Sequence, residues 1–213
     1  MNNILVDILF RWGHVLFGIT WIGLLYYFNF VQGEYFKEAS KDALPDVKAK
    51  LATRALWWFR WAAMFTFITG IVLLGVLGKS SSGFIVVGAT LGTFMMLNVW
   101  LIIWPNQKVV LGLTDGDVPS SAAKAGLASR TNTLFSAPML MGMLASKHGA
   151  AFSAGMLPVM GGYSTGLMVT LGLMILIQLN AMFGKMGPMA SVKGVIHLSL
   201  VLTAAMVALL VYV

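Results

Sequence analysis

The sequence predicts an all-α membrane protein, a polytopic bundle of about six transmembrane helices. Of its 213 residues, 59% are hydrophobic and only 10% are charged, and the mean hydropathy is +0.86. These values lie outside the range of soluble globular domains. The apolar runs are close to twenty residues long, which is the length that a helix needs to cross a bilayer core. They are continuous rather than alternating, which favours helices over the strands of a barrel.

The expected spans form one integral membrane domain over residues 1–213. The first run is expected to remain in the protein, because it lacks the basic segment and cleavage site of a signal peptide and is too long for one. The charged stretch 33–54 is expected to be a solvated loop or surface helix. Pro105 is expected to end the third span. The glycine-rich segment 149–162 is expected to form an interfacial or re-entrant loop. The spans cover residues 5–31, 55–78, 83–104, 131–147, 163–183 and 193–213.

The basic residues predict how the bundle is oriented. Ten Lys and Arg residues fall in or beside the first, third and fifth connections, which are 33–54, 105–130 and 184–193. Three, Arg11, Lys79 and Lys147, fall on the other side. Cytoplasmic loops carry the excess of Lys and Arg, so both termini should face outward, toward the periplasm of a bacterium. We therefore expect a multi-pass protein of the bacterial inner membrane. The net charge of +7 reflects this orientation, and nucleic-acid binding is not expected.

The absence of cysteine narrows the possible cofactors. Without a thiolate the chain has no disulfide, no iron–sulfur cluster and no covalently attached c-type haem. The remaining ligands for iron are His, Met or oxygen. A neutral imidazole inside a helix bundle is the usual ligand of haem b, so the three histidines, His14, His148 and His197, are the candidate cofactor ligands.

Depth in the membrane separates the three histidines. At ~1.5 Å per residue, His14 should lie about 5 to 10 Å below the outer face and His197 near the inner face. These two should not share one iron. His148 ends the fourth span on the outer side, so the predicted metal site pairs His14 with His148. For His197, a hydrogen bond to a neighbouring helix is the alternative role.

Arg11 lies three residues before His14 and should project from the same face of the helix. A cation there suits a haem propionate or another anion. The alternative is an ion pair with Asp7, one turn earlier.

A second cation, Arg60, stands inside the string Trp57-Trp58-Phe59-Arg60-Trp61 near the inner face. This string favours an interfacial aromatic belt with a cation–π contact. A polar pocket that joins Arg60 to Asn98 or Gln178 is the alternative.

Four strings together resemble the urate oxidase N-terminal family, the amino-terminal membrane domain of bacterial membrane-bound urate hydroxylase. They are RWGHVLFGITWIGLLYYFNF, ALWWFRWAAMFTFITG, NVWLIIWPNQK and ASRTNTLFSAPMLMGM. The first string also weakly resembles the opening helix of haem-dependent membrane protoporphyrinogen oxidases. The resemblance implies a polytopic inner-membrane protein and, for the enzyme members, urate hydroxylation with electrons leaving through a fused c-type cytochrome. This chain departs from that pattern, because it has no CxxCH motif and reads Arg130-Thr131-Asn132 where Arg-His-Asn is expected.

Two functions of different classes remain open at this point. The first is a haem b redox protein that passes electrons to a separate partner cytochrome or quinone, with or without urate hydroxylase-like activity. The second is a non-catalytic accessory subunit of a larger membrane complex, in which glycine- and methionine-rich faces pack against other helices. A small transporter is less well supported, because no acidic residue lies within any span after Asp7.

Overall fold

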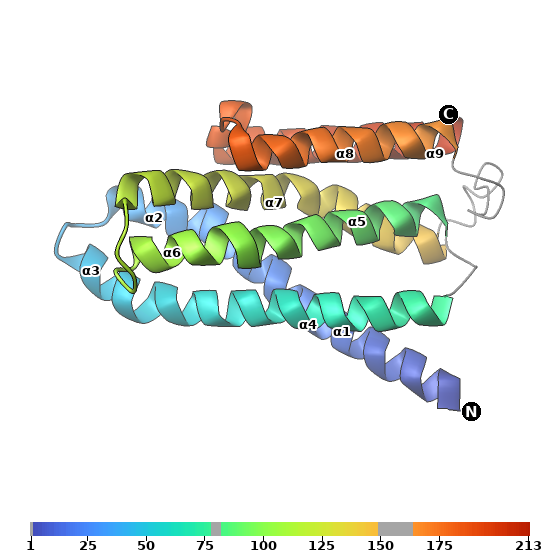
Figure 1. The fold of residues 1–213 in the computed structure, drawn as a ribbon, viewed down its shortest axis with the longest axis horizontal. Coiled ribbons are helices and arrows are strands. Elements are labelled where there is room, and N and C mark those ends of the chain that lie inside the picture. The colour runs from blue at the N-terminus through green and yellow to red at the C-terminus, as the bar shows by residue number, and fades with distance from the viewer. Residues whose placement is uncertain (1, 78–81, 149–163) are drawn as a thin grey trace.

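The computed structural model describes residues 2–77, 82–148 and 164–213, and these residues form helices and turns without any strand. The long helices lie side by side, and the chain reverses direction at each end of the bundle (Figure 1). The predicted all-α bundle is therefore confirmed.

The amino-terminal half contains three long helical segments, each interrupted by a π-helical turn. The first joins α1, η1 and α2, the second joins α3, η2 and α4, and the third joins α5, η4 and α6. Their bounds are α1 Asn2–Tyr26, η1 Tyr27–Gln32, α2 Gly33–Glu38, α3 Ala43–Val47, η2 Lys48–Ala52, α4 Thr53–Leu77, α5 Gly83–Leu97, η4 Asn98–Ile103 and α6 Trp104–Val110. The carboxy-terminal half contains α7 Val118–His148, α8 Thr165–Phe183, the 3₁₀-helix η7 Gly187–Ala190 and α9 Val192–Tyr212.

Five helical segments are long and apolar enough to cross a membrane, which makes the chain a multi-pass membrane protein. They are Ile4–Glu38, Ala43–Leu77, Gly83–Val110, Thr165–Phe183 and Val192–Tyr212. The remaining predicted span, 131–147, is part of α7, which is 31 residues long but less apolar.

The low hydropathy of α7 follows from its central position. It packs against α1, α5, α6, α8 and α9. Its polar side chains Thr131, Asn132, Thr133 and Ser136 are at most 2% exposed. Asn132 and Ser136 bond to neighbouring helical segments, whereas Thr131 and Thr133 bond to carbonyl oxygens of their own helix. Because these polar side chains are buried, the average hydropathy of α7 understates how deeply the helix is buried.

α5 and α7 cross closely near the start of α5 and the end of α7. A methyl group on Gly142 would lie 2.7 Å from the carbonyl oxygen of Phe84 and 2.9 Å from the Cα of Gly88. Only glycine permits this approach of the two backbones.

Both termini lie at one end of the bundle, and the turns that carry most of the basic residues lie at the opposite end (Figure 1). This common placement of the termini agrees with the prediction. The stretch 33–54, expected to be a loop or surface helix, forms the helical segments α2, α3 and η2 and the beginning of α4. The segment 149–162 lies outside the described residues.

The expectation that Pro105 ends the third span is wrong. The helix continues through Pro105 as α6 and ends at Val110. The wider π-helical turn of η4 directly precedes the proline, and its shifted hydrogen-bond register relieves the clash of the ring with the preceding turn. Asn106 then donates from Nδ2 to the carbonyl oxygen of Ile102 at 2.7 Å.

Candidate functional site

The imidazole of His14 is held between α1 and α4. Its Nδ1 lies 2.9 Å from the carbonyl oxygen of Thr66 and 3.1 Å from Oγ1 of Thr69. A carbonyl oxygen can only accept, so Nδ1 carries the proton and donates it. In the neutral ring this places the free lone pair on Nε2. The His14 side chain is therefore fixed in the tautomer that offers Nε2 to an electrophile or a metal.

Gly70 makes room for this imidazole. A methyl group at Gly70 would lie 3.1 Å from Cε1 and 3.5 Å from Nδ1 of His14. The ring thus packs directly on the backbone of α4, one turn beyond the carbonyl that it binds. A side chain at this position would push the ring away from Thr66.

Arg11 is engaged by Asp7 in the structure. Its Nη2 lies 2.5 Å from Oδ1 of Asp7 and its Nε lies 3.3 Å from Oδ2, which is a bidentate pair one turn apart. Of the two roles expected for Arg11, this geometry is that of the ion pair. The Arg11 side chain remains 39% exposed, so part of it faces outward from the bundle.

The other two histidines are not brought beside His14 by any contact in the described part of the chain. His148 is the last residue of α7, and its side chain lies outside the description. His197 is exposed on α9, one turn beyond Lys193, near the basic end where it was predicted. Within the described ranges, no cluster of three or more His, Asp or Glu residues could hold a metal ion.

Three amide side chains meet in the middle of the bundle from three different helical segments. Asn98 donates from Nδ2 to Oδ1 of Asn132 at 2.9 Å and to Oε1 of Gln178 at 3.0 Å. Gln178 donates from Nε2 back to Oδ1 of Asn98 at 2.6 Å. Asn132 donates from Nδ2 to the carbonyl oxygen of Met95 at 2.9 Å. We call Asn98, Asn132 and Gln178 the amide cluster.

The amide cluster answers one alternative left open by the sequence. Asn98 and Gln178 bond to each other, and the third member of the contact is Asn132, which bonds to Asn98, rather than Arg60. Asn98 and Asn132 are 1% and 0% exposed. Every amide group of Asn98 has a partner, which favours a role in joining η4, α7 and α8.

A second polar seam runs between α1 and α7. The hydroxyl groups of Tyr26 and Ser136 are 2.8 Å apart, and Asn29 donates from Nδ2 to Oγ of Ser129 at 2.8 Å. Asn29 is 6% exposed and belongs to the π-helical turn η1, while Asn98 opens η4. π-Helical turns often occur at functional sites. The residue pattern predicted neither η1 nor η4.

Five buried polar atoms have no hydrogen-bond partner among the described residues. They are Nε1 of Trp21, Oε1 of Gln32, Nε and Nη1 of Arg60, and Nη1 of Arg130. Because four of these five atoms are donors, the interior has a surplus of N–H groups. Such a surplus suits an acceptor or an anion better than a cation.

The Arg60 guanidinium makes the cation–π contact predicted for it. Its Cζ lies 3.7 Å from the centre of the Trp104 ring, and Trp100 donates from Nε1 to the carbonyl oxygen of Arg60 at 3.1 Å. The aromatic belt is therefore built between α4 and the third helical segment.

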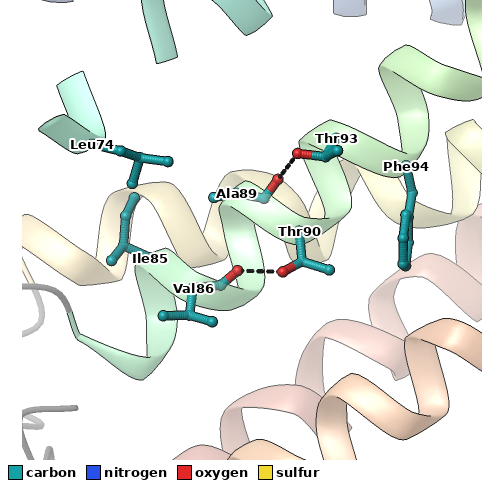
Figure 2. Close-up of a pocket in the computed structure, with 7 residues that line it drawn as sticks. All are labelled: Leu74, Ile85, Val86, Ala89, Thr90, Thr93 and Phe94. Atoms are coloured by element: carbon teal, nitrogen blue, oxygen red, sulfur yellow. Dashed lines mark hydrogen bonds between the residues drawn. The ribbon is translucent and has the colours of Figure 1, made fainter. Parts of the chain in front are cut away.

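An open groove on α5 is apolar, and no histidine lines it. It is lined by Leu74 from α4 and by Ile85, Val86, Ala89, Thr90, Thr93 and Phe94 from α5. Figure 2 shows that the two threonine hydroxyls turn back to the carbonyl oxygens of Val86 and Ala89 on the same helix. The groove therefore presents almost no free polar group and has the character of a lipid-facing surface.

Comparison with known families gives one match. The model of the family described as urate oxidase N-terminal matches residues 77–208, which is more than half of the chain. The chain belongs to the urate oxidase N-terminal family. Searches of curated proteins and of solved structures found no match.

The part that matches the urate oxidase N-terminal family runs from the end of α4 through most of α9. It includes the whole amide cluster and Arg130. His14 and Arg11 lie before it, so the two strings quoted from the first and second spans are outside the matched residues.

Proposed function

We propose that this member of the urate oxidase N-terminal family is a haem b redox protein of the bacterial inner membrane. The observation that carries the proposal is the orientation of His14, whose Nδ1–H is held by the Thr66 carbonyl. Metal-binding histidines commonly donate their second ring nitrogen to a backbone carbonyl, which fixes the ring and makes it a better ligand.

The surroundings of His14 fit an axial haem ligand in three respects. The ring is partly buried between two membrane helices, its Nε2 carries the lone pair, and the missing side chain at Gly70 allows it to pack on α4. A free Nε2 is what iron requires from a neutral histidine. Bound haem would supply one-electron chemistry, and His14 would hold and orient its iron.

His148, the last residue of α7, would be the second residue that holds the iron, because α7 ends toward the same end of the bundle as the amino terminus (Figure 1). Arg11 is the cation nearest in sequence to the iron ligand, and its partly exposed guanidinium could serve a propionate while it remains paired with Asp7. His197 belongs to the opposite, basic end and has no part in this site.

Electrons would leave to a separate protein or to a quinone. A c-type haem needs cysteine, and these 213 residues contain none, so they hold no covalently attached haem that could accept the electrons. We also propose urate as the electron donor, and this part of the proposal rests on family membership alone.

The internal pairing of the amide cluster favours a second candidate, a non-catalytic accessory subunit. Asn132, at the centre of α7, bonds to Asn98 and to the carbonyl oxygen of Met95, and Gln178 bonds to Asn98, which leaves these amides little capacity for a substrate. In that case the chain should purify with fixed stoichiometric partners.

The haem content of the purified protein separates these candidates. We expect about one haem b per chain in the wild type, loss of most of it in His14→Ala, and full retention in His197→Ala, the matched control at the other end of the bundle. Pyridine extraction and absorbance give the stoichiometry. Equal haem in His14→Ala and wild type would reject the ligand assignment, and a wild-type protein without haem would reject the redox function.

A further inference from the structure

We propose that Arg60 and Lys108 form a binding site for the phosphate of an anionic phospholipid, organised on the ring of Trp104. The proposal does not depend on haem or on any redox function. It starts from two cations that share one indole ring at the basic end of the bundle.

The two cations come from different helices. The Cζ of Arg60 lies 3.7 Å from the ring centre of Trp104, and the Nζ of Lys108 lies 6.0 Å from the same centre. The two charged groups are therefore no more than about 10 Å apart, so both lie within reach of one phospholipid headgroup. Trp104 and Lys108 are one helical turn apart on α6, which places them on one face.

The arrangement is already formed without a ligand. Trp100 donates to the carbonyl oxygen of Arg60 and contacts Trp61 edge to face at 5.3 Å, so the backbone under Arg60 is anchored to the third helical segment. The planar guanidinium on the Trp104 face cannot turn freely. A charged site that is held in place needs less ordering when it binds its ligand.

Both cations lack a carboxylate partner within the described residues. The ion pairs there use other cations, namely Arg11, Lys37 and Lys50. In addition, Nε and Nη1 of Arg60 are buried without a hydrogen-bond partner. None of the described residues therefore supplies an anion for this guanidinium.

The location selects a lipid as the source of that anion. Arg60 is close to the start of α4 and Lys108 close to the end of α6, at the end of the bundle where most basic residues gather (Figure 1). Basic pockets between transmembrane helices on the cytoplasmic side are typical sites for anionic headgroups. The tryptophans are also typical of the interfacial layer, where phosphates lie.

Native mass spectrometry of the delipidated, intact chain tests the proposal with phosphatidylglycerol and phosphatidylcholine as probes. We expect the first bound phosphatidylglycerol to be retained at a lower lipid concentration than phosphatidylcholine. Arg60→Gln and Lys108→Gln should each raise the concentration for half occupancy about five- to tenfold. Lys124→Gln, which removes an exposed charge from α7 near the same end, is the matched control and should have no effect.

Three results would overturn the proposal. They are equal retention of the two lipids, equal weakening by Lys124→Gln, and displacement of the bound lipid by inorganic phosphate, which would assign the site to a soluble anion. Circular dichroism establishes that each variant is folded. If Arg60→Gln does not fold, Arg60→Lys replaces it, because it keeps the charge but loses the planar stack and should weaken retention by a smaller factor.

Discussion

Asn98 joins three helical segments through its one side chain, so its replacement should weaken the whole bundle. Asn98→Ala removes the bonds to Asn132 and Gln178 and the bond that Gln178 donates in return. Interhelical hydrogen bonds in membrane proteins are worth about 0.6 kcal/mol on average. The three bonds together predict a loss of about 2 kcal/mol of unfolding free energy.

Unfolding in mixed micelles of mild detergent and SDS, followed by circular dichroism, measures this loss. Asn106→Ala is the matched control, because Asn106 bonds only to a carbonyl oxygen of its own helix. The control should lose less than about 0.5 kcal/mol. If Asn98→Ala loses no more than Asn106→Ala, the amide cluster does not hold the bundle together.

A double-mutant cycle tests whether the loss comes from the cluster itself. Asn98 and Gln178 exchange two hydrogen bonds, so Asn98→Ala and Gln178→Ala should be less than additive. The expected coupling is about 1 kcal/mol. Strict additivity would mean that the two side chains act separately.

Two glycine substitutions test the other close contacts. Gly142→Ala would press a methyl group into the backbone of α5 and should lower the unfolding free energy by about 1 to 3 kcal/mol. Gly92→Ala is the control and should not lower it, because the nearest neighbour of the added methyl group would be a methionine methyl at 4.0 Å. Equal stability of the two variants would contradict the close crossing of α5 and α7. Gly70→Ala should displace the imidazole of His14 and reduce the amount of bound haem, measured by absorbance, at least severalfold. Gly18→Ala is the control and should retain the haem, because its added methyl group would lie 4.0 Å from the nearest neighbour. Equal haem in the two variants would contradict the role of this ring packing in haem binding.

The architecture was predictable from the sequence because a helix that crosses lipid needs a long uninterrupted apolar run, and five of the described helical segments have one. The predicted fourth span, 131–147, is only part of the helix, because α7 begins at Val118. The polar residues of α7 face the bundle centre, and hydropathy cannot distinguish a polar face turned inward from one turned toward water. The prediction that Pro105 ends the third span was wrong, because the π-helical turn of η4 lets the helix continue.

The candidate site was only partly predictable. His14 stands out in the sequence because an ionisable residue inside an apolar run needs a partner. Its tautomer depends on the Thr66 carbonyl of another helix, and no local pattern encodes that contact. Asn98 and Gln178 were considered only as alternative partners of Arg60, and the amide cluster that they form with Asn132 depends on the crossing of three helical segments.

Chemical rescue of an iron ligand tests the redox proposal most directly. In His14→Gly the axial nitrogen is missing while the surrounding helices are kept, so free imidazole can occupy the vacated space. We expect the reduced-minus-oxidised spectrum of the wild type to show the bands of a b-type haem, the variant to lose them, and added imidazole to restore them. A wild-type spectrum without these bands, or a variant spectrum identical to that of the wild type before imidazole is added, would contradict the proposal.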